Sequence, residues 1–215
     1  ENTAVGQVAL DANTTGSYCT ALGRHALSSS STADNNTAIG RNALGDDSTG
    51  HTNTALGKDA LGNTTTGDNN IGIGHNAQSS AVGANGECTL GDSNIDHLRC
   101  NVDSIASLSD ERDKTEIVNS TYGLTFVNTL QPRQFKWQTR DGNIKDGKTR
   151  LGFTAQELLT SCDGNNNVLD LVLDNNPEKL EAKYSNLIPI LTKAIQELST
   201  ENEALLTRIE ALENA

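Results

Sequence analysis

A glycine recurs every 17 residues through the first part of the chain, at Gly6, Gly23, Gly40, Gly57 and Gly74. Each of them closes a short motif, which reads NTAVG, CTALG, NTAIG, NTALG and NIGIG in turn. A column of leucines repeats with the same period: Leu10, Leu27, Leu44 and Leu61. A constant period of this length is typical of a solenoid, in which each coil packs only on its neighbours.

Each repeat contains two short alternating runs separated by Ser, Thr, Asn, Asp and Gly residues, which predicts strands joined by turns. The fixed glycine permits a corner that a Cβ atom would block. One coil has too few large apolar side chains for a core, so we expect stacked coils, and three chains side by side, to bury a continuous one. The spacing shortens after Gly74, to Gly83 and Gly91, which predicts that the roll ends near residue 91.

These NTAIG…AL units resemble the left-handed β-roll repeats in the heads of trimeric autotransporter adhesins and in many phage fibres. The resemblance covers about residues 1–91. It implies an N-terminal, all-β, trimeric β-roll. Residues 92–109 are then expected to form a thinner stalk or the end of a triple β-helix. Because Glu1 lies inside the repeat pattern, we expect the chain to be part of a longer protein.

Charge and composition exclude several classes of function. Acidic residues outnumber basic ones by 11 to 4 in residues 1–109 and by 17 to 12 in residues 110–215. Nucleic acid requires basic patches, so we expect no nucleic-acid partner. No run of 18 apolar residues occurs, so we expect no membrane insertion. The cysteines lack metal-site spacing and the histidines are expected to be solvated, so we expect no metal and no other cofactor.

The C-terminal segment from Tyr184 to Glu213 reads as one long helix with a heptad repeat. Isoleucine or asparagine occupies one position of the heptad and leucine another, in the order Ile188, Leu191, Ile195, Leu198, Asn202, Leu205, Ile209 and Leu212. This a/d pattern predicts a coiled coil over about residues 184–213, with Asn202 fixing register. Ile at a with Leu at d favours two strands, but the solenoid indicates three. We predict three, because the same symmetry must hold along the whole particle.

Ser109, Asp110, Glu111, Arg112, Asp113 and Lys114 form a charged hexapeptide between the two halves. By itself, this sequence is typical of a helix start with Ser109 as N-cap. It also contains a nucleophile and a base, because lysine can activate serine when its pKa falls towards neutrality. A turn could bring Ser109 and Lys114 together, whereas five residues of regular strand would span roughly 16 Å.

Three further blocks follow in order: LQPRQFKW at 130–137, LGFTAQEL at 151–158 and KYSNLIPILTKAIQEL at 183–198. Together with the hexapeptide they resemble the C-terminal intramolecular chaperone domain of phage tailspikes and tail fibres, the S74 family of self-cleaving peptidases. The resemblance implies that residues 110–215 form an α+β domain ending in a coiled-coil helix. It also implies a homotrimer, in which three such domains hold three chains in register while the fibre folds and then release themselves.

The same resemblance implies that Ser109 is the nucleophile and Lys114 the general base of an autocatalytic serine endopeptidase. Arg112 matches the motif and is expected to have a positioning role only. The Ser109 hydroxyl can reach the carbonyl of Leu108 through a five-membered ring, which predicts a cut before Ser109. A cut between Ser109 and Asp110 would need a hydroxyl from a neighbouring chain or the Asp110 carboxylate, so both cleavage sites remain open.

The sequence thus predicts the C-terminal part of a trimeric phage tail fibre or tailspike, located in the virion and assembled in the host cytoplasm. The N-terminal fibre part is expected to meet a host cell-surface receptor. The alternative is a cellular trimeric adhesin or tethered factor that reuses the same self-cleaving domain. Within the domain, the polar segment 139–149 is expected to form the tip of a long hairpin between the runs QFKW and RLGF.

Overall fold

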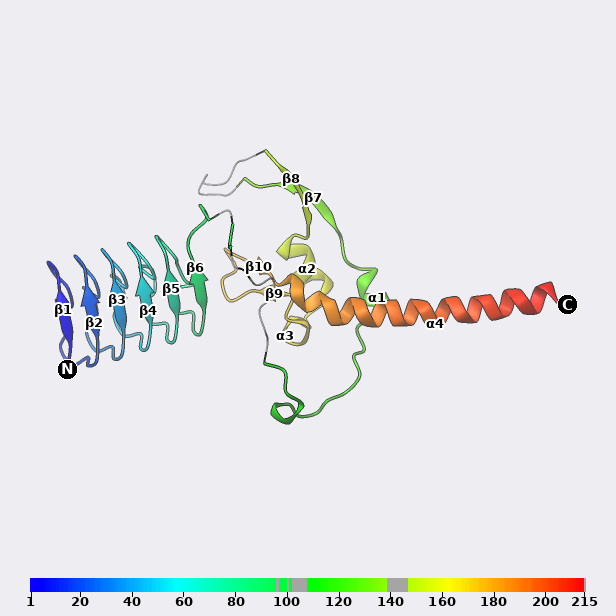
Figure 1. Ribbon diagram of the computed structural model, residues 1–215, viewed down its shortest axis with the longest axis horizontal. Helices are drawn as coiled ribbons and strands as arrows, with labels where there is room; N and C mark the ends of the chain where they lie inside the picture. Colours follow the sequence, from blue (N-terminus) through cyan, green and yellow to red (C-terminus); the bar gives the residue numbers. More distant parts are fainter. Residues whose placement is uncertain (96, 100, 102–107, 139–146, 215) are drawn as a thin grey trace. The chain divides into compact units, whose positions relative to one another are not determined.

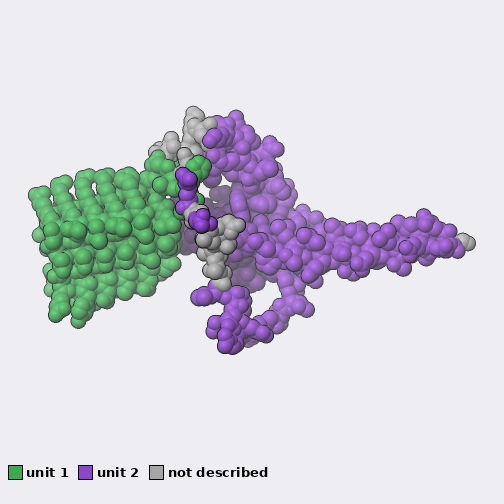
Figure 2. Space-filling view, viewed as in Figure 1, with its two compact units in different colours: residues 1–98, 138–145 green, residues 99–137, 146–215 purple. Residues whose placement is uncertain are grey.

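The computed structural model describes residues 1–95, 97–99, 101, 108–138 and 147–214. By contacts, the chain divides into two compact units (Figure 2). Unit 1 comprises residues 1–98 with 138–145, and unit 2 comprises residues 99–137 with 146–215. The tip expected at 139–149 lies largely outside the described residues and the stalk expected at 92–109 lies partly outside them, so both stay predictions.

Six short parallel strands form one sheet in unit 1, in the order β1-β2-β3-β4-β5-β6 (Figure 1). They are β1 (Thr3–Val5), β2 (Thr20–Leu22), β3 (Thr37–Ile39), β4 (Thr54–Leu56), β5 (Ile71–Ile73) and β6 (Cys88–Leu90). Each strand pairs with the residues 17 positions on, so that Ala21 lies beside Ala38 and Ala38 beside Ala55. This arrangement confirms the predicted solenoid of stacked coils.

The 17-residue period continues to β6, contrary to the expected shortening after Gly74. Ile71 pairs with Cys88, and Gly91 follows Gly74 by one full repeat. Gly83, which suggested a shorter spacing, belongs to the turn between two strands. The shortened spacing was therefore wrong. The last strand of this sheet, β6, ends at Leu90, and the end of the roll near residue 91 stays a prediction.

The glycine corners are required by the distance between coils. Gly23 and Gly40 have φ of 139° and 140°, a region that residues with a Cβ rarely adopt. A Cβ atom on Gly40 would collide with the carbonyl oxygen of Gly57 in the next coil. Each corner therefore seats directly on the corner of the following coil.

The second alternating run of each repeat forms turns rather than a strand. Leu27, Leu44 and Leu61 have φ of 51°, 48° and 48°, and their side chains are almost completely buried. The Leu27 N–H donates to the carbonyl of Ala43 in the next coil, at 3.0 Å. Stacking thus satisfies the backbone while the left-handed residue bends the chain, so the prediction of two strands per coil was wrong.

Buried asparagines also connect successive coils. Asn36 donates from Nδ2 to the carbonyl of Gly50, at 2.7 Å, and accepts at Oδ1 from the N–H of Asn53, at 2.7 Å. Asn53 and Asn70 repeat both contacts one coil further on. Cys19 occupies the same station in the second coil and donates its thiol to the carbonyl of Ala33 instead.

Unit 2 contains short elements packed around the start of one long helix (Figure 1). The elements are a 3-10 turn η1 (Glu111–Asp113), α1 (Leu124–Val127), β7 (Arg133–Lys136), β8 (Thr149–Gly152), α2 (Ala155–Ser161), α3 (Asn166–Leu169), β9 (Val172–Leu173), β10 (Glu181–Ala182), a 3-10 turn η2 (Tyr184–Asn186) and α4 (Leu187–Glu213). Strands β7 and β8 pair antiparallel, as do β9 and β10. The core contains Phe126, Leu158, Leu171, Leu187 and Ile190.

The long helix expected from Tyr184 begins as the 3-10 turn η2 and becomes α-helical at Leu187. Leu187, Ile190 and Ala194 are buried against the core of unit 2. The heptad positions lie elsewhere on the helix surface, and Ile195 is 67% exposed. In the described residues no helix is both long and apolar enough to cross a membrane.

We expect Gly40→Ala to lower the free energy of unfolding by more than about 2 kcal/mol, because the new Cβ is both strained and in collision with Gly57. Gly83→Ala is the matched control, since its Cβ would meet only the Thr66 hydroxyl, at 3.2 Å. Denaturant unfolding followed by circular dichroism measures both. Equal stability of the two variants would contradict the stacked corner.

Asp47 makes the stability of the roll depend on pH. Burial raises the pKa of its carboxyl to about 7, while the Gly50 N–H lowers it and Asp68 raises it further. The folded state therefore binds a proton more tightly than the unfolded chain, whose aspartate pKa is about 3.9. We expect this contribution to be present below about pH 4, to decrease between about pH 4 and 7, and to be lost above. Asp47→Ser, which copies Ser30 of the preceding coil, should remove this dependence in unfolding experiments at several pH values.

Candidate active site at Ser109 and Lys114

The hexapeptide 109–114 folds into one tight turn, η1. Asp110, rather than Ser109, is the N-cap, because its Oδ1 accepts from the N–H of Arg112, at 2.9 Å. The N–H of Lys114 donates to the carbonyl of Glu111, at 3.1 Å, and closes the turn. The expectation of Ser109 as the cap was therefore wrong, since the shorter helix begins two residues beyond it.

The turn brings the nucleophile and the base candidates together. Lys114 Nζ lies 2.6 Å from Ser109 Oγ, which is hydrogen-bonding distance. A general base must lie within this reach of the proton that it removes, and a serine needs such a base before it can attack a carbonyl. In this contact Lys114 Nζ is the donor and Ser109 Oγ the acceptor. The catalytic roles of the two residues stay predictions.

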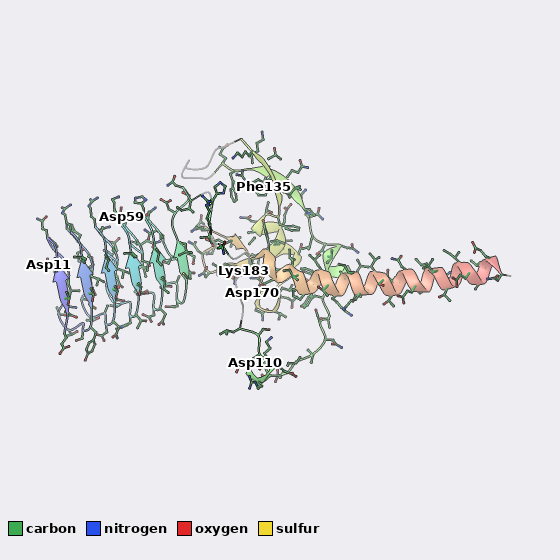
Figure 3. The ribbon with its side chains drawn as sticks, viewed as in Figure 1. Asp11, Asp59, Asp110, Phe135, Asp170 and Lys183 are labelled. Carbon is green, nitrogen blue, oxygen red and sulfur yellow. The ribbon has the colours of Figure 1, made fainter. Side chains whose placement is uncertain are left out.

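Arg112 holds Asp110 through its side chain. Its Nε and Nη2 donate to the two carboxylate oxygens of Asp110, at 3.0 and 2.5 Å. These hydrogen bonds lower the pKa of Asp110 and raise that of Arg112. The carboxylate of Asp110 is thus occupied by Arg112 and by the backbone of η1, which leaves it poorly placed to act as a nucleophile. Figure 3 labels Asp110 at this turn.

The residues around the bond between Leu108 and Ser109 are open to solvent. Leu108 is fully exposed, and the side chains of Ser109 and Lys114 are exposed as well. Lysine acts as a general base when burial or neighbouring cations lower its pKa. The single chain therefore provides the contact between the two side chains but not the water-excluded surroundings that this chemistry favours.

Two contacts in unit 2 join the sequence blocks that follow the turn, and a third caps α2 within one block. Arg133 of β7 forms a bidentate ion pair with Glu157 of α2. Thr154 caps α2 by accepting from the N–H of Glu157, at 3.3 Å. The hydroxyl of Tyr184 accepts from the N–H of Phe153 and donates to its carbonyl, at 3.1 and 3.0 Å. The sequence contains these residues within its motifs but does not reveal their pairing, because Arg133 and Glu157, and likewise Tyr184 and Phe153, lie far apart along the chain.

The histidines, glycines and cysteines of the repeats have contacts that fit a structural role. His75 contacts Asp92 and Lys58 at the surface, and Gly74 lies at a coil corner. Cys19 and Cys162 are buried and Cys88 is exposed, all as free thiols, whereas Cys100 is outside the described residues. Among the residues that the structure describes, no group of three or more His, Cys, Asp or Glu side chains could hold a metal ion.

Comparison with known proteins yields a match that begins at Ser109. Residues 109–164 match the sequence model of the Peptidase_S74 family, described as chaperone of endosialidase. This segment of the chain is similar to the Peptidase_S74 family. The S74 segment includes the Ser109–Lys114 turn, the β7–β8 hairpin and α2. No curated protein and no solved structure matches the chain significantly.

We expect Asp110→Ala to slow self-cleavage of the S74 segment by about tenfold or more, since loss of the cap loosens the turn that holds Lys114 near Ser109. Asp110→Asn is the matched control, because its amide oxygen can still accept from the N–H of Arg112. Band intensities on denaturing gels at successive times give both rates. Equal slowing by the two substitutions would indicate that the charge of Asp110, and not the cap, matters.

Proposed function

We propose that this chain is the C-terminal part of a trimeric phage tail fibre or tailspike, whose S74 domain is an intramolecular chaperone that finally cuts itself off at Ser109. The observation that carries the proposal is the 2.6 Å contact between Lys114 Nζ and Ser109 Oγ, at the first residue of the family match. The family description, chaperone of endosialidase, supports the chaperone role. The proposal places the protein in the virion, after assembly in the host cytoplasm.

The chemistry of release follows from the geometry of the turn. Lys114 removes the proton from Ser109 Oγ, which attacks the carbonyl carbon of Leu108 through a five-membered ring. The peptide bond between Leu108 and Ser109 breaks, Lys114 returns the proton to the departing amine, and an ester to Ser109 Oγ remains. Water then hydrolyses the ester, so that one fragment ends with the Leu108 carboxylate and the other begins with the Ser109 amine.

Two features of unit 2 support association of several copies. The heptad positions of α4 are exposed, including Leu198 at 46%, Leu205 at 52% and Ile209 at 50%. The buried positions Leu187, Ile190 and Ala194 already bind the helix to its own domain. One helix therefore has a face for its own core and a second apolar face for neighbouring helices, which suits a coiled coil.

A removable clamp has a physical advantage for a fibre of this kind. Bringing three separate chains together has an entropy cost that comes before any contact between them forms. Joining three C-termini converts a search among three molecules into a local one. Release after winding would leave the fibre with no easy route back to unfolded chains. The exposure of Ser109 and Lys114 suggests that assembly supplies the cover that excludes water from them.

We expect Lys114→Ala to fold and trimerise but to remain full length, with cleavage slowed by about 10²- to 10⁴-fold, because the proton acceptor of Ser109 is lost. Lys136→Ala, which removes another exposed lysine of the same unit, should cleave normally. Denaturing gels and sedimentation report cleavage and association. Intact mass distinguishes a cut before Ser109 from a cut after it.

Cleavage of Lys114→Ala at the wild-type rate would rule out the Ser109–Lys114 pair. A monomeric chain that stays unbroken after long storage would rule out the proposed function as a whole. A cut between Ser109 and Asp110 would require a hydroxyl from a neighbouring chain, since the Asp110 carboxylate is held by Arg112.

A further inference from the structure

An exposed tether connects the Ser109–Lys114 turn to the core of unit 2. Every residue from 108 to 121 is exposed, and Gly123 is the first buried residue after the turn. A cavity of about 510 Å³ lies between residues 118–122 and the start of α4. We call residues 115–122 the tether. Its fixed end lies at Gly123, where α1 begins.

Helix α1 lacks a local cap, and α4 supplies one. Gly123 is the N-cap residue of α1 and has no side chain that could accept from the first N–H groups of the helix. Glu197 Oε2, which lies 73 residues further along the chain, accepts from the Leu124 N–H at 2.7 Å instead. Helix α1 lies against α4 (Figure 1), and Phe126 packs in the same core as Ile190. The Glu197 carboxylate thus binds the fixed end of the tether directly to the long helix.

Glu197 ends the stripe of residues by which α4 binds its own domain. Leu187, Ile190 and Ala194 are buried, and Glu197 continues their spacing of three and four residues. Its side chain is 35% exposed, whereas every later residue of α4 is classed as exposed. The next residue, Leu198, is a heptad position. Glu197 therefore lies where α4 leaves its own domain, beside the face proposed to bind neighbouring helices.

The surroundings of Glu197 favour the charged form that accepts the hydrogen bond. The Leu124 N–H has the largest effect and lowers the pKa of the Glu197 carboxyl, burial opposes it, and Lys193 lowers it further. Lys193 Nζ lies 3.5 Å from Glu197 Oε1. A Cβ atom on Gly123 would collide with both carboxylate oxygens of Glu197. The absence of a side chain at position 123 therefore makes room for the contact.

We propose that Glu197 regulates release by fixing the tether to α4, so that association of the α4 helices carries the Ser109–Lys114 turn to a defined place. This inference rests on the proposed function, because it requires self-cleavage at Ser109. The eight residues of the tether span at most about 30 Å, so the fixed end limits where the turn can go. A fixed end concentrates the turn at the water-excluding surroundings that the proposed assembly supplies, whereas a loose end spreads it over a larger volume. Glu197 acts through the tether and is a positioning residue.

The experiment follows self-cleavage of the full-length chain and of two variants that break the contact in different ways. Glu197→Ala removes the acceptor of the Leu124 N–H. Gly123→Ala displaces the acceptor through the collision and leaves Glu197 itself unchanged. We expect each variant to slow self-cleavage by about tenfold, with association and helix content as in the wild-type chain.

Two further variants serve as controls. Glu197→Gln keeps an amide oxygen that can accept from the Leu124 N–H, although a neutral acceptor forms the weaker bond, so we expect cleavage within about threefold of the wild-type rate. Glu201→Ala removes an exposed glutamate one turn further along α4 and should cleave at the wild-type rate.

The measurements separate a positioning role from a general loss of stability. Denaturing gels at successive times after synthesis give the cleavage rate, sedimentation gives association, circular dichroism gives helix content, and hydrogen exchange of the Leu124 amide reports the contact itself. Rescue by Glu197→Gln, with faster exchange at Leu124 and unchanged association in Glu197→Ala, supports the inference. Cleavage of Glu197→Ala at the wild-type rate would overturn it, as would slowing that occurs only together with loss of association or of helix content.

Failure of this inference and failure of the proposed function give different results. A wild-type chain that never cleaves refutes both. A wild-type chain that cleaves, with Lys114→Ala blocked and Glu197→Ala as fast as wild type, refutes only the role of Glu197.

Discussion

Each coil of the roll has to lie directly over the next one, because the corners leave no space for any other arrangement. Gly23 meets the backbone of Gly40, and Gly40 meets that of Gly57, at distances that exclude a Cβ atom. The same register carries the backbone hydrogen bonds, the asparagine contacts and the burial of Leu27, Leu44 and Leu61. A single slip of one coil would break all of them together, which makes the register a property of the whole stack.

Because the coils stack in register, the roll has a core of small and aliphatic side chains and also repeats aliphatic side chains on its outer surface. Alanine and leucine fill the inside of one chain completely, so its core needs no second copy. The outside of the sheet nevertheless repeats an aliphatic side chain in every coil, from Val5 to Leu90. Because every coil has the same geometry, the same surface position recurs at the spacing between coils. A row of apolar side chains at this spacing is suited to a partner with the same spacing.

In the Ser109–Lys114 turn, the geometry depends on residues of the turn itself, whereas the surroundings do not. Its geometry is local: Asp110 caps the turn, Arg112 holds Asp110, and Lys114 closes the turn beside Ser109. Its surroundings are not local, because Leu108, Ser109 and Lys114 are exposed in the single chain. A site that is preformed but uncovered can be switched by assembly. We consider this the physical basis on which a chaperone segment can remain attached until it has acted.

The sequence by itself determined the features that depend on spacing. The glycine period specified stacked coils, the heptads specified a long helix with an apolar face, and the hexapeptide specified where Ser109 and Lys114 lie. Only the tertiary structure decided that the second run of each coil bends at left-handed Leu27 and Leu44, that the period reaches Gly91, and that Asp110 rather than Ser109 caps the turn. It also decided that Arg133 pairs with Glu157 and Tyr184 with Phe153. Spacing along a chain defines which residues repeat. Backbone bends and distant contacts depend on which buried polar groups still need hydrogen-bond partners once the coils have stacked and the core has formed.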